Sequence, residues 1–475
     1  MTFQLTPIGY VVIAATAALL VLRPGWLIGW TVFLSVFQAA AVIVVNLNGH
    51  YPIGLQPCFF AAPVAILAWL LSRRPSRWIP APVARLCLPV FLFAVFAVGS
   101  AVLFPRVFAG LLVVNPRGLL EPLRPALTQL SAALYLVCCC LYFLAVAGKA
   151  AAGQDHAAGR RLVNWLLAGA VVAALVGFYQ VLAARAGLPY PHQFFNSNPG
   201  YSQRFGDTVD HTQRLTGTFT EASVAAWYFG AATVYCLWQV LFARRRGLYL
   251  AALALCGAAL LRTESSTAYL LVIGIALLIG LRLLWLRRVT ATTVGALMAA
   301  TILLGGVVVW ALRDQRFVRR MLDILVFRKA RTISYVERML SNRAAWHAFV
   351  ATRGWGAGWG SLRASSLAAT LLGTVGVVGA LLALWFALRL ARLEWRIRSL
   401  DRVRFPHREG MIAALAAMIG AGFVSVTDMI YYLPFWALVA VYAVNAWHET
   451  EARRGIGATS ASRESVRVSA LAAGR

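Results

Sequence analysis

The sequence predicts an all-α polytopic integral membrane protein with about 12 to 13 transmembrane helices. Hydrophobic residues make up 61% of the 475-residue chain, and the mean hydropathy is +0.73. Apolar runs long enough to span a bilayer recur along the chain, and basic residues gather in the short loops between them. A soluble globular fold is excluded, because such a fold does not carry repeated apolar runs of this length.

The predicted spans follow the apolar runs in chain order. They lie near residues 7–22, 26–45, 55–71, 86–104, 127–147, 162–183, 217–241, 248–261, 267–285, 291–312, 367–388, 410–427 and 432–447. The first lacks a basic flank and a small-residue cleavage site, so we expect a retained span and not a signal peptide. Residues 1–447 are therefore predicted to form one integral membrane domain. Residues 448–475, rich in Ala, Ser, Gly and Arg, are predicted to form a disordered cytoplasmic tail.

The basic loops set the orientation. Five clusters alternate onto one side of the membrane: Arg73, Arg74 and Arg77; Lys149, Arg160 and Arg161; Arg244–Arg246; Arg287 and Arg288; and the series from Arg389 to Arg404. Lysine and arginine in short loops favour the cytoplasmic side. The same parity places residues 46–54, 105–126, 184–216 and 313–366 outside.

The longest outside segment, 313–366, is itself basic, with eleven Lys or Arg residues against three acids. Arginines kept against the topological bias need another reason, and binding of an anion is one. The alternative is an amphipathic interfacial helix that contacts lipid headgroups, which the spacing of Arg316, Arg319, Arg320 and Arg328 fits. Both interpretations remain open.

Composition limits the classes of partner and site that are expected. The net charge of +28 lies largely in loops that meet anionic membrane lipid, so nucleic-acid binding is not expected. The seven cysteines fall in or beside apolar segments, which predicts no disulfide framework. The run from Cys138 to Cys140 has no nearby His or acid, so no metal site is predicted. We see no internal repeat, which weighs against a secondary carrier.

The first candidate motif is HTQRLTGTFTEASVAAWYFG, residues 211–230, at the start of the seventh predicted span. Arg214 can pair with a phosphate, and Glu221 at the lip of the span can act as a base. A carboxylate in this position is costly unless it is paired or used. The alternative is a structural Arg214–Glu221 ion pair that caps the helix. His211 is expected to be a solvated loop residue.

The second motif is LRTESSTAYLLVIG, residues 261–274, between the eighth and ninth predicted spans. It brings Arg262 and Glu264 to the outer face, where they can share a cavity with Arg214. Ser265 can instead serve as the N-cap of the ninth span.

The third motif is SNRAAWHAFVATRGWGAGWGSLRASS, residues 341–366. Glycines permit close backbone approach and expose amides, and tryptophans stack on sugar faces, so the pattern suits a sugar joined to a phosphate. An interfacial aromatic belt is the alternative for the tryptophans. The candidate residues here are Arg343, His347, Trp355, Trp359, Arg363, Ser365 and Ser366.

Three blocks in order carry a family resemblance. RLTGTFTEAS, TESSTAYLL, and NRAAW followed by GWGAGWGSLRASSLAATLLGTVGVVG resemble the O-antigen ligase and O-antigen/exopolysaccharide polymerase superfamily over roughly residues 160–390. The resemblance implies a bacterial inner-membrane glycosyltransferase with a GT-C-like helical architecture. It also implies an undecaprenyl-diphosphate-linked glycan used on the periplasmic face, with no cofactor, nucleotide sugar or required metal.

The resemblance also bears on single residues. Arg214 matches the family's arginine proposed to engage the diphosphate. The family's Ser-Arg pair is replaced by Ser266-Thr267. Ligases carry a catalytic His eleven residues before the Gly-x-x-Gly of the later span, and the count back from Gly376 reaches Ser365. This departure favours the exopolysaccharide polymerase branch.

The predicted function is transfer of a growing glycan from undecaprenyl diphosphate to an incoming lipid-linked repeat unit. The predicted diphosphate ligands are Arg214, Arg262, Arg343 and Arg363, and the predicted sugar contacts are Trp355, Trp359, Ser365 and Ser366. Arg363 is also predicted to stabilise the leaving group, with Glu221, Glu264 or His347 as the base. The alternatives are an O-antigen ligase acting on lipid A core and a flippase. A chain-length regulator is a possible partner of a polymerase.

Overall fold

The structure is a computed structural model of the chain. It describes residues 2–46, 52–72, 79, 81–152, 157–200, 208–209, 212–243, 246–268, 270–272, 274–275, 333–397, 406–424 and 428–450. Most of the described chain is helical. The prediction of a mostly helical chain is therefore confirmed. Three small antiparallel sheets, which the apolar pattern did not predict, lie between the helices.

Five described helices are long and apolar enough to cross a membrane. They are α4 (Ala81–Val107), α5 (Leu127–Ala152), α6 (Ala157–Ala186), α8 (Ala222–Phe242) and α14 (Leu367–Ile397). Shorter helices are α1 (Pro7–Leu22), η1 (Pro24–Trp26), α2 (Leu27–Leu34), α3 (Pro57–Leu71), α7 (His192–Phe195), α9 (Gly247–Arg262), α13 (Ile333–Ala351), α15 (Pro406–Val424) and η5 (Asp428–Tyr431). Residues 433–450 are also helical.

These helices coincide with most of the predicted spans. The predicted spans at 267–285 and 291–312 lie outside the described residues, except for helical residues 267–268, 270–272 and 274–275. The predicted interfacial helix around Arg316 to Arg328 also lies outside them. The total of about 12 to 13 spans therefore stays a prediction.

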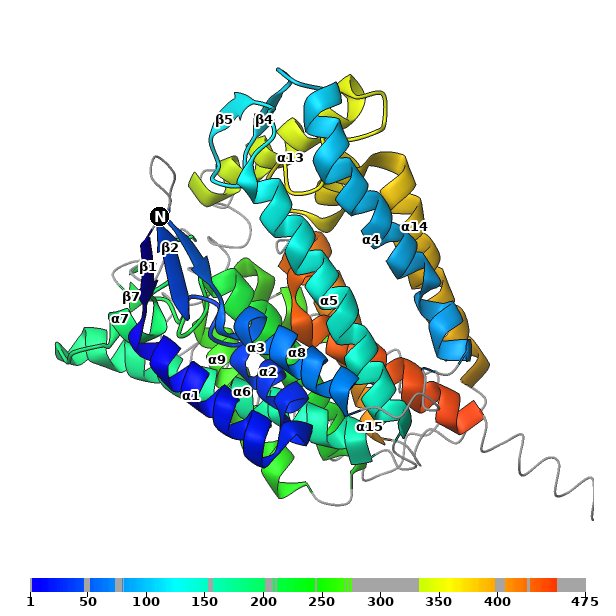
Figure 1. Ribbon diagram of the computed structural model, residues 1–475. Coiled ribbons are helices and arrows are strands. Elements are labelled where there is room, and N and C mark those ends of the chain that lie inside the picture. Colours follow the sequence, from blue (N-terminus) through cyan, green and yellow to red (C-terminus); the bar gives the residue numbers. More distant parts are fainter. Residues whose placement is uncertain are drawn as a thin grey trace, which may run out of the picture.

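Two groups of helices are visible in Figure 1. In one, α8 packs against α9 and α15, and α2 packs against α3 and α6. In the other, α4 and α14 stand side by side, and α4 also contacts α5. Helix α13 and the hairpin of β4 (Leu112–Val114) and β5 (Leu120–Pro122) lie together at one end of α4 and α14 (Figure 1).

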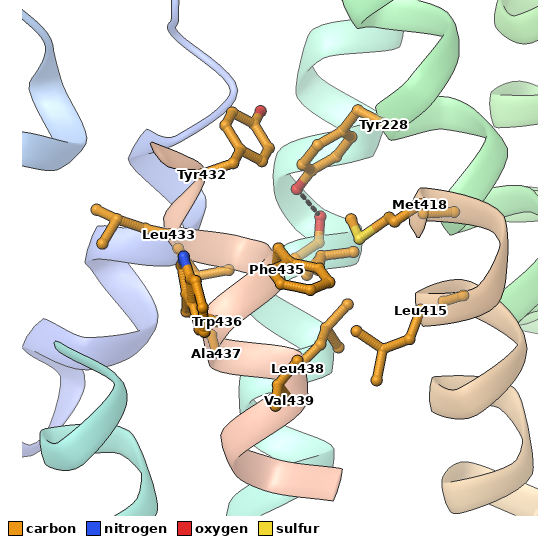
Figure 2. Packing of buried hydrophobic residues seen from close by; sticks show 14 of the residues in the cluster. Tyr228, Leu415, Met418, Tyr432, Leu433, Phe435, Trp436, Ala437, Leu438 and Val439 are labelled. Atoms are coloured by element: carbon orange, nitrogen blue, oxygen red, sulfur yellow. Dashed lines mark hydrogen bonds between the residues drawn. The ribbon is translucent and has the colours of Figure 1, made fainter. Parts of the chain in front are cut away.

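The core of the first group surrounds α8. The Trp227 indole N–H donates to the Met418 carbonyl of α15 at 2.8 Å, and the Tyr228 hydroxyl donates to the Leu166 carbonyl of α6 at 2.9 Å. Figure 2 shows Phe435 of the last helix gathered with Tyr228 and Met418. These hydrogen bonds satisfy the polar ends of large buried aromatic side chains, which lets them lie among apolar neighbours.

The predicted span 26–45 is not one helix, and this prediction was wrong. Helix α2 ends at Leu34, residues 35–42 are irregular and buried, and β2 (Ile43–Asn46) follows. Strand β2 lies between β1 (Thr2–Leu5) and β3 (Ile53–Leu55), with Thr2 opposite Asn46. The apolar composition of the run hid the break, because composition alone does not separate a helix from buried irregular backbone.

Long-range hydrogen bonds explain how this irregular segment is tolerated. Ala39 N donates to the Thr218 carbonyl at 3.0 Å, and its carbonyl accepts from Asn198 N at 3.0 Å. Thr218 Oγ1 donates to the Val36 carbonyl at 2.6 Å, and Val42 N donates to the Leu55 carbonyl at 2.8 Å. Irregular backbone inside a membrane protein persists only where the protein supplies such partners.

The last helix extends beyond its predicted end. Residues 433–450 are helical and carry the fold three residues into the predicted tail. Glu449 is buried there and pairs with Arg408 of α15. The start of the tail is therefore folded, and residues 451–475 lie outside the described part of the chain.

Candidate functional site

The first motif forms a buried non-helical segment, residues 214–221, that leads into α8. Gln180 of α6 supports it: Gln180 Oε1 accepts from Thr216 N at 3.2 Å and from Gly217 N at 2.7 Å. Gly217 has a φ of +58°, and a Cβ atom there would lie 3.0 Å from the Ala173 carbonyl oxygen. The segment thus needs glycine both for its backbone conformation and for its close contact with α6.

Arg214 lies at the C-terminal end of α9. Its Nε donates to the Thr263 carbonyl at 3.1 Å, and its Nη2 donates to the Glu264 carbonyl at 3.3 Å. Leu215 N donates to the Arg262 carbonyl at 3.2 Å. The carbonyl end of a helix favours a cation, so this contact both positions the guanidinium and stabilises the helix terminus.

The second motif joins the same cluster. Arg262 Nη1 forms an ion pair with Glu264 Oε1, and Arg262 Nη2 donates to the Gln213 carbonyl at 3.1 Å. The structure therefore brings Arg214, Arg262 and Glu264 together. Ser265 Oγ accepts from Thr267 N at 3.3 Å, which is the predicted capping contact.

Glu264 has an unusual environment. Its φ is +47°, which is strained for a residue with a side chain. The side chain is 10% exposed, and no described residue provides a hydrogen-bond partner for Oε2. Backbone strain and a buried carboxylate oxygen without a described partner both cost free energy of folding. The rest of the fold therefore holds Glu264 in an unfavourable conformation.

Glu221 pairs with the third motif. The residue is the N-cap of α8, and its Oε1 lies 3.5 Å from Arg363 Nη2. Its Oε2 accepts from Ser223 Oγ at 3.2 Å. Among the described residues, the ion-pair partner of Glu221 is thus Arg363, and the predicted alternative of an Arg214–Glu221 pair does not occur.

The backbone of Arg363 is held by the small hairpin. Arg363 N donates to the Val114 carbonyl of β4 at 2.8 Å, and the flanking residues Leu362 and Ala364 are buried. The Arg363 side chain is 40% exposed. Its guanidinium therefore projects from a fixed backbone toward the start of α8.

The glycine-rich loop does not expose its amides, so this part of the prediction was wrong. Gly356 N donates to Thr352 Oγ1 at 2.8 Å, Ala357 N to the Gly373 carbonyl at 2.7 Å, and Gly358 N to the Thr374 carbonyl at 2.8 Å. The accepting carbonyls lie just before Gly376, where α14 has non-helical torsions. The glycines allow the loop to pack against the interrupted turn of α14 and leave no amide cradle for phosphate.

The two tryptophans of the loop differ. Trp359 is fully buried, and its ring packs against Phe93 and Tyr431 at centroid distances of 5.5 and 5.2 Å. Its indole N–H donates to the Ala132 carbonyl at 3.3 Å. Trp359 is a core residue with no free face for a sugar, contrary to the prediction. Trp355 is 51% exposed and keeps an accessible face.

The remaining predicted residues lie along α13 and at the start of α14. Arg343 and His347 are exposed on α13. Ser365 Oγ lies 3.1 Å from Ser341 Oγ, and Ser365 N donates to Asn342 Oδ1 at 2.8 Å. The Ser366 carbonyl accepts from Thr370 N at 2.9 Å at the start of α14. These contacts give both serines local structural roles. Among the described residues, no hydrogen bond or ion pair joins Arg343 or His347 to Glu221 or Glu264.

Sequence reasoning did not single out Gln180, Asn198 or Asn342. The signal for Gln180 was available, because a buried amide inside an otherwise apolar span is costly without a partner. Asn198 and Asn342 lie in a loop and an amphipathic helix, where asparagine carries little information. His211 lies outside the described residues. Among those that are described, no group of three His, Cys, Asp or Glu side chains is placed to hold a metal ion.

Comparison with family models and with curated proteins returns no match for this chain.

Proposed function

We propose that this chain is a membrane glycosyltransferase that polymerises undecaprenyl-diphosphate-linked repeat units. The observation that carries the proposal is the placement of three arginines and two carboxylates around residues 214–221. Arg214 and Arg262 lie at one side with Glu264, and Arg363 pairs with Glu221 at the other. Because these residues come from three distant stretches of sequence, the fold concentrates charge where a helical bundle otherwise excludes it.

The charges suit transfer from a lipid diphosphate. Guanidinium groups stay charged and can pair with two phosphate oxygens at once, so they can neutralise a diphosphate leaving group. The carboxylate of Glu221 or Glu264 is the proposed base for the acceptor hydroxyl. Trp355, with its exposed ring, is the proposed sugar contact.

We place this site on the periplasmic face of a bacterial inner membrane. The support is the alternation of basic loops in the sequence, which assigns residues 105–126, 184–216 and 313–366 to the outside. The contact between Arg363 and Val114 joins two of these segments. That contact is consistent with one common side for both.

Polymerase is proposed over ligase because Ser365 stands where the ligase histidine would be expected. Ser365 is engaged by Ser341 and Asn342, which suits a structural hydroxyl better than a base. Transporters bind ions through exposed carbonyls of unwound backbone, and residues 35–42 after α2 are irregular backbone of this kind. Here the carbonyls of Val36 and Ala39 already accept hydrogen bonds from Thr218 and Asn198, which weighs against transport.

Reconstitution tests the proposal. Purified protein in liposomes is given a synthetic undecaprenyl-diphosphate-linked repeat unit, and products are separated by gel and mass spectrometry. A ladder of repeat units is the expected result. Transfer only when lipid A core is added would identify a ligase, and translocation of the lipid without a covalent product would identify a flippase.

A further inference from the structure

The ion pair between Arg363 and Glu221 is weak enough for another charged group to replace one of the two partners. A single contact of 3.5 Å joins the groups, and the two side chains are 40% and 23% exposed. Partly solvated pairs of this kind are weak, because water screens the charges and neither side chain is fully ordered by the contact. A ligand with more negative charge than one carboxylate can therefore compete for Arg363.

Each partner keeps its position when the pair opens. Arg363 is anchored through its backbone N–H on the Val114 carbonyl. Glu221 retains the hydrogen bond from Ser223 Oγ to Oε2, and the N-terminus of α8 favours its negative charge. Opening the pair thus frees one guanidinium and one carboxylate oxygen without moving the backbone of either residue.

We propose that the donor diphosphate displaces Glu221 from Arg363, so that donor binding itself releases the catalytic base. This inference rests on the proposed function. A diphosphate offers several anionic oxygens to the planar guanidinium fork, whereas Glu221 uses one contact. Without donor, the Glu221 carboxylate is therefore paired with Arg363 and is not available as a base. With donor bound, the carboxylate is unpaired and can accept a proton.

The acceptor hydroxyl oxygen forms a bond with the anomeric carbon of the donor glycan, and the bond from that carbon to the diphosphate oxygen breaks. The electron pair leaves with undecaprenyl diphosphate, whose charge Arg363 neutralises. The hydroxyl proton passes to Glu221 Oε1, giving a neutral carboxylic acid.

Glu264 does not fit the same role. Its Oε1 is engaged by Arg262, its side chain is 10% exposed, and its backbone carbonyl holds Arg214. A residue this buried serves to position the two arginines. The exchange of partners is therefore assigned to Glu221 alone.

The test measures binding and transfer separately. Full-length protein in nanodiscs is titrated with undecaprenyl diphosphate that carries no glycan, and repeat-unit transfer is followed in the same preparation. Removing the competing carboxylate in Glu221→Gln should tighten binding about two- to fivefold, the range expected for a partly exposed ion pair. Polymer formation by the same variant should be lost.

Three further variants isolate the cause. Arg363→Ala should weaken binding, and Glu221→Gln added to Arg363→Ala should give no tightening. Glu337→Gln removes an exposed acid from α13 and controls for a general change in charge. It should leave binding and transfer at the wild-type level.

The outcomes separate the two proposals. If the wild-type protein binds the lipid diphosphate and makes polymer, but Glu221→Gln binds no tighter or still polymerises, the displacement is refuted and the proposed function stands. If Glu337→Gln tightens binding equally, the effect is one of net charge and the displacement is also refuted. If the wild-type protein makes no covalent product, the proposed glycosyltransferase function is itself refuted.

Discussion

Gln180 and Gly217 connect α6 to the buried segment that precedes α8. Gln180 Oε1 accepts from Gly217 N at 2.7 Å and from Thr216 N at 3.2 Å. The same segment carries Arg214 at its start and Glu221 at its end. One buried amide thus supports the segment that joins Arg214 to Glu221.

The first prediction concerns a variant that removes the hydrogen bonds of Gln180. Gln180→Met keeps the side-chain volume but leaves two buried N–H groups without an acceptor, which costs about 1–3 kcal/mol for each. We expect a lower unfolding temperature in detergent and loss of polymer in the reconstituted assay. Leu182→Met, at an exposed position of the same helix, is the matched control. Wild-type stability and activity in Gln180→Met would contradict the assigned role.

The second prediction concerns the glycine-rich loop. Gly356 has a φ of +84°, and a Cβ atom there would lie 2.5 Å from the Thr374 carbonyl oxygen. Gly356→Ala should therefore sharply reduce the yield of monodisperse protein, since backbone strain alone costs about 1–3 kcal/mol. Gly257→Ala in α9, where a Cβ atom would have no neighbour within 4 Å, should be tolerated. Size-exclusion chromatography of tagged protein compares them, and equal yields would contradict the packing argument.

The third prediction separates the two tryptophans. Trp359→Ala should destabilise the protein by about 3–5 kcal/mol, because it empties a packed core site. Trp355→Ala should leave the unfolding temperature nearly unchanged but raise the apparent KM for the lipid-linked repeat unit. Thermal unfolding and reconstituted kinetics measure the two effects. An unchanged KM in a stable Trp355→Ala protein would remove this residue from the sugar site.

The sequence predicted the helices better than the breaks between them. Apolar runs located α4, α5 and α6, because a long uniform run has few alternatives to a helix in a membrane. The end of α2 at Leu34 could not be predicted, since it depends on Thr218 and Asn198, far away in the chain. The sequence around α2 does not indicate hydrogen-bond partners that lie so far away in the chain.

The sequence predicted some features of the candidate site and not others, for a related reason. The motifs identified Arg214, Arg262 and Glu264, and the structure brings these together. The sequence could not distinguish Trp355 from Trp359, because both follow the same Gly-Trp pattern and only their neighbours differ. Nor could it pair Glu221 with Arg363, which requires the loop before α14 to reach the start of α8.

The fourth prediction concerns pH and the buried charges near the end of the last helix. Burial raises the pKa of Glu449 from 4.5 to about 7, while the positive charge of Arg408 opposes the rise. Glu409 and Glu394 add negative charge nearby and raise this pKa further. The folded protein therefore binds a proton that the unfolded chain releases between these two values.

The sign follows from this difference. The stability contributed by the protonated carboxyl is complete below about pH 4.5 and is lost as the pH rises through about 7. Glu449→Gln, which mimics the neutral acid, should flatten the dependence of the unfolding temperature on pH between 5 and 8. Arg408→Gln should instead lower stability increasingly as the pH rises, because it leaves buried carboxylates unpaired once they ionise. The same slope in wild type and Glu449→Gln would exclude the carboxyl as its source.

The fifth prediction tests the arginines in cells that make the polysaccharide. Arg214→Ala and Arg363→Ala should each abolish polymer while single repeat units accumulate on lipid, with rates reduced about 10²–10³-fold, as when one electrostatic donor is lost. Arg214 also holds the Thr263 and Glu264 carbonyls, so protein levels must be measured by immunoblot. Arg124→Ala removes an exposed arginine of the 105–126 segment and should make normal polymer. Normal chain lengths from Arg214→Ala and Arg363→Ala at wild-type protein levels would refute the roles assigned to both guanidinium groups.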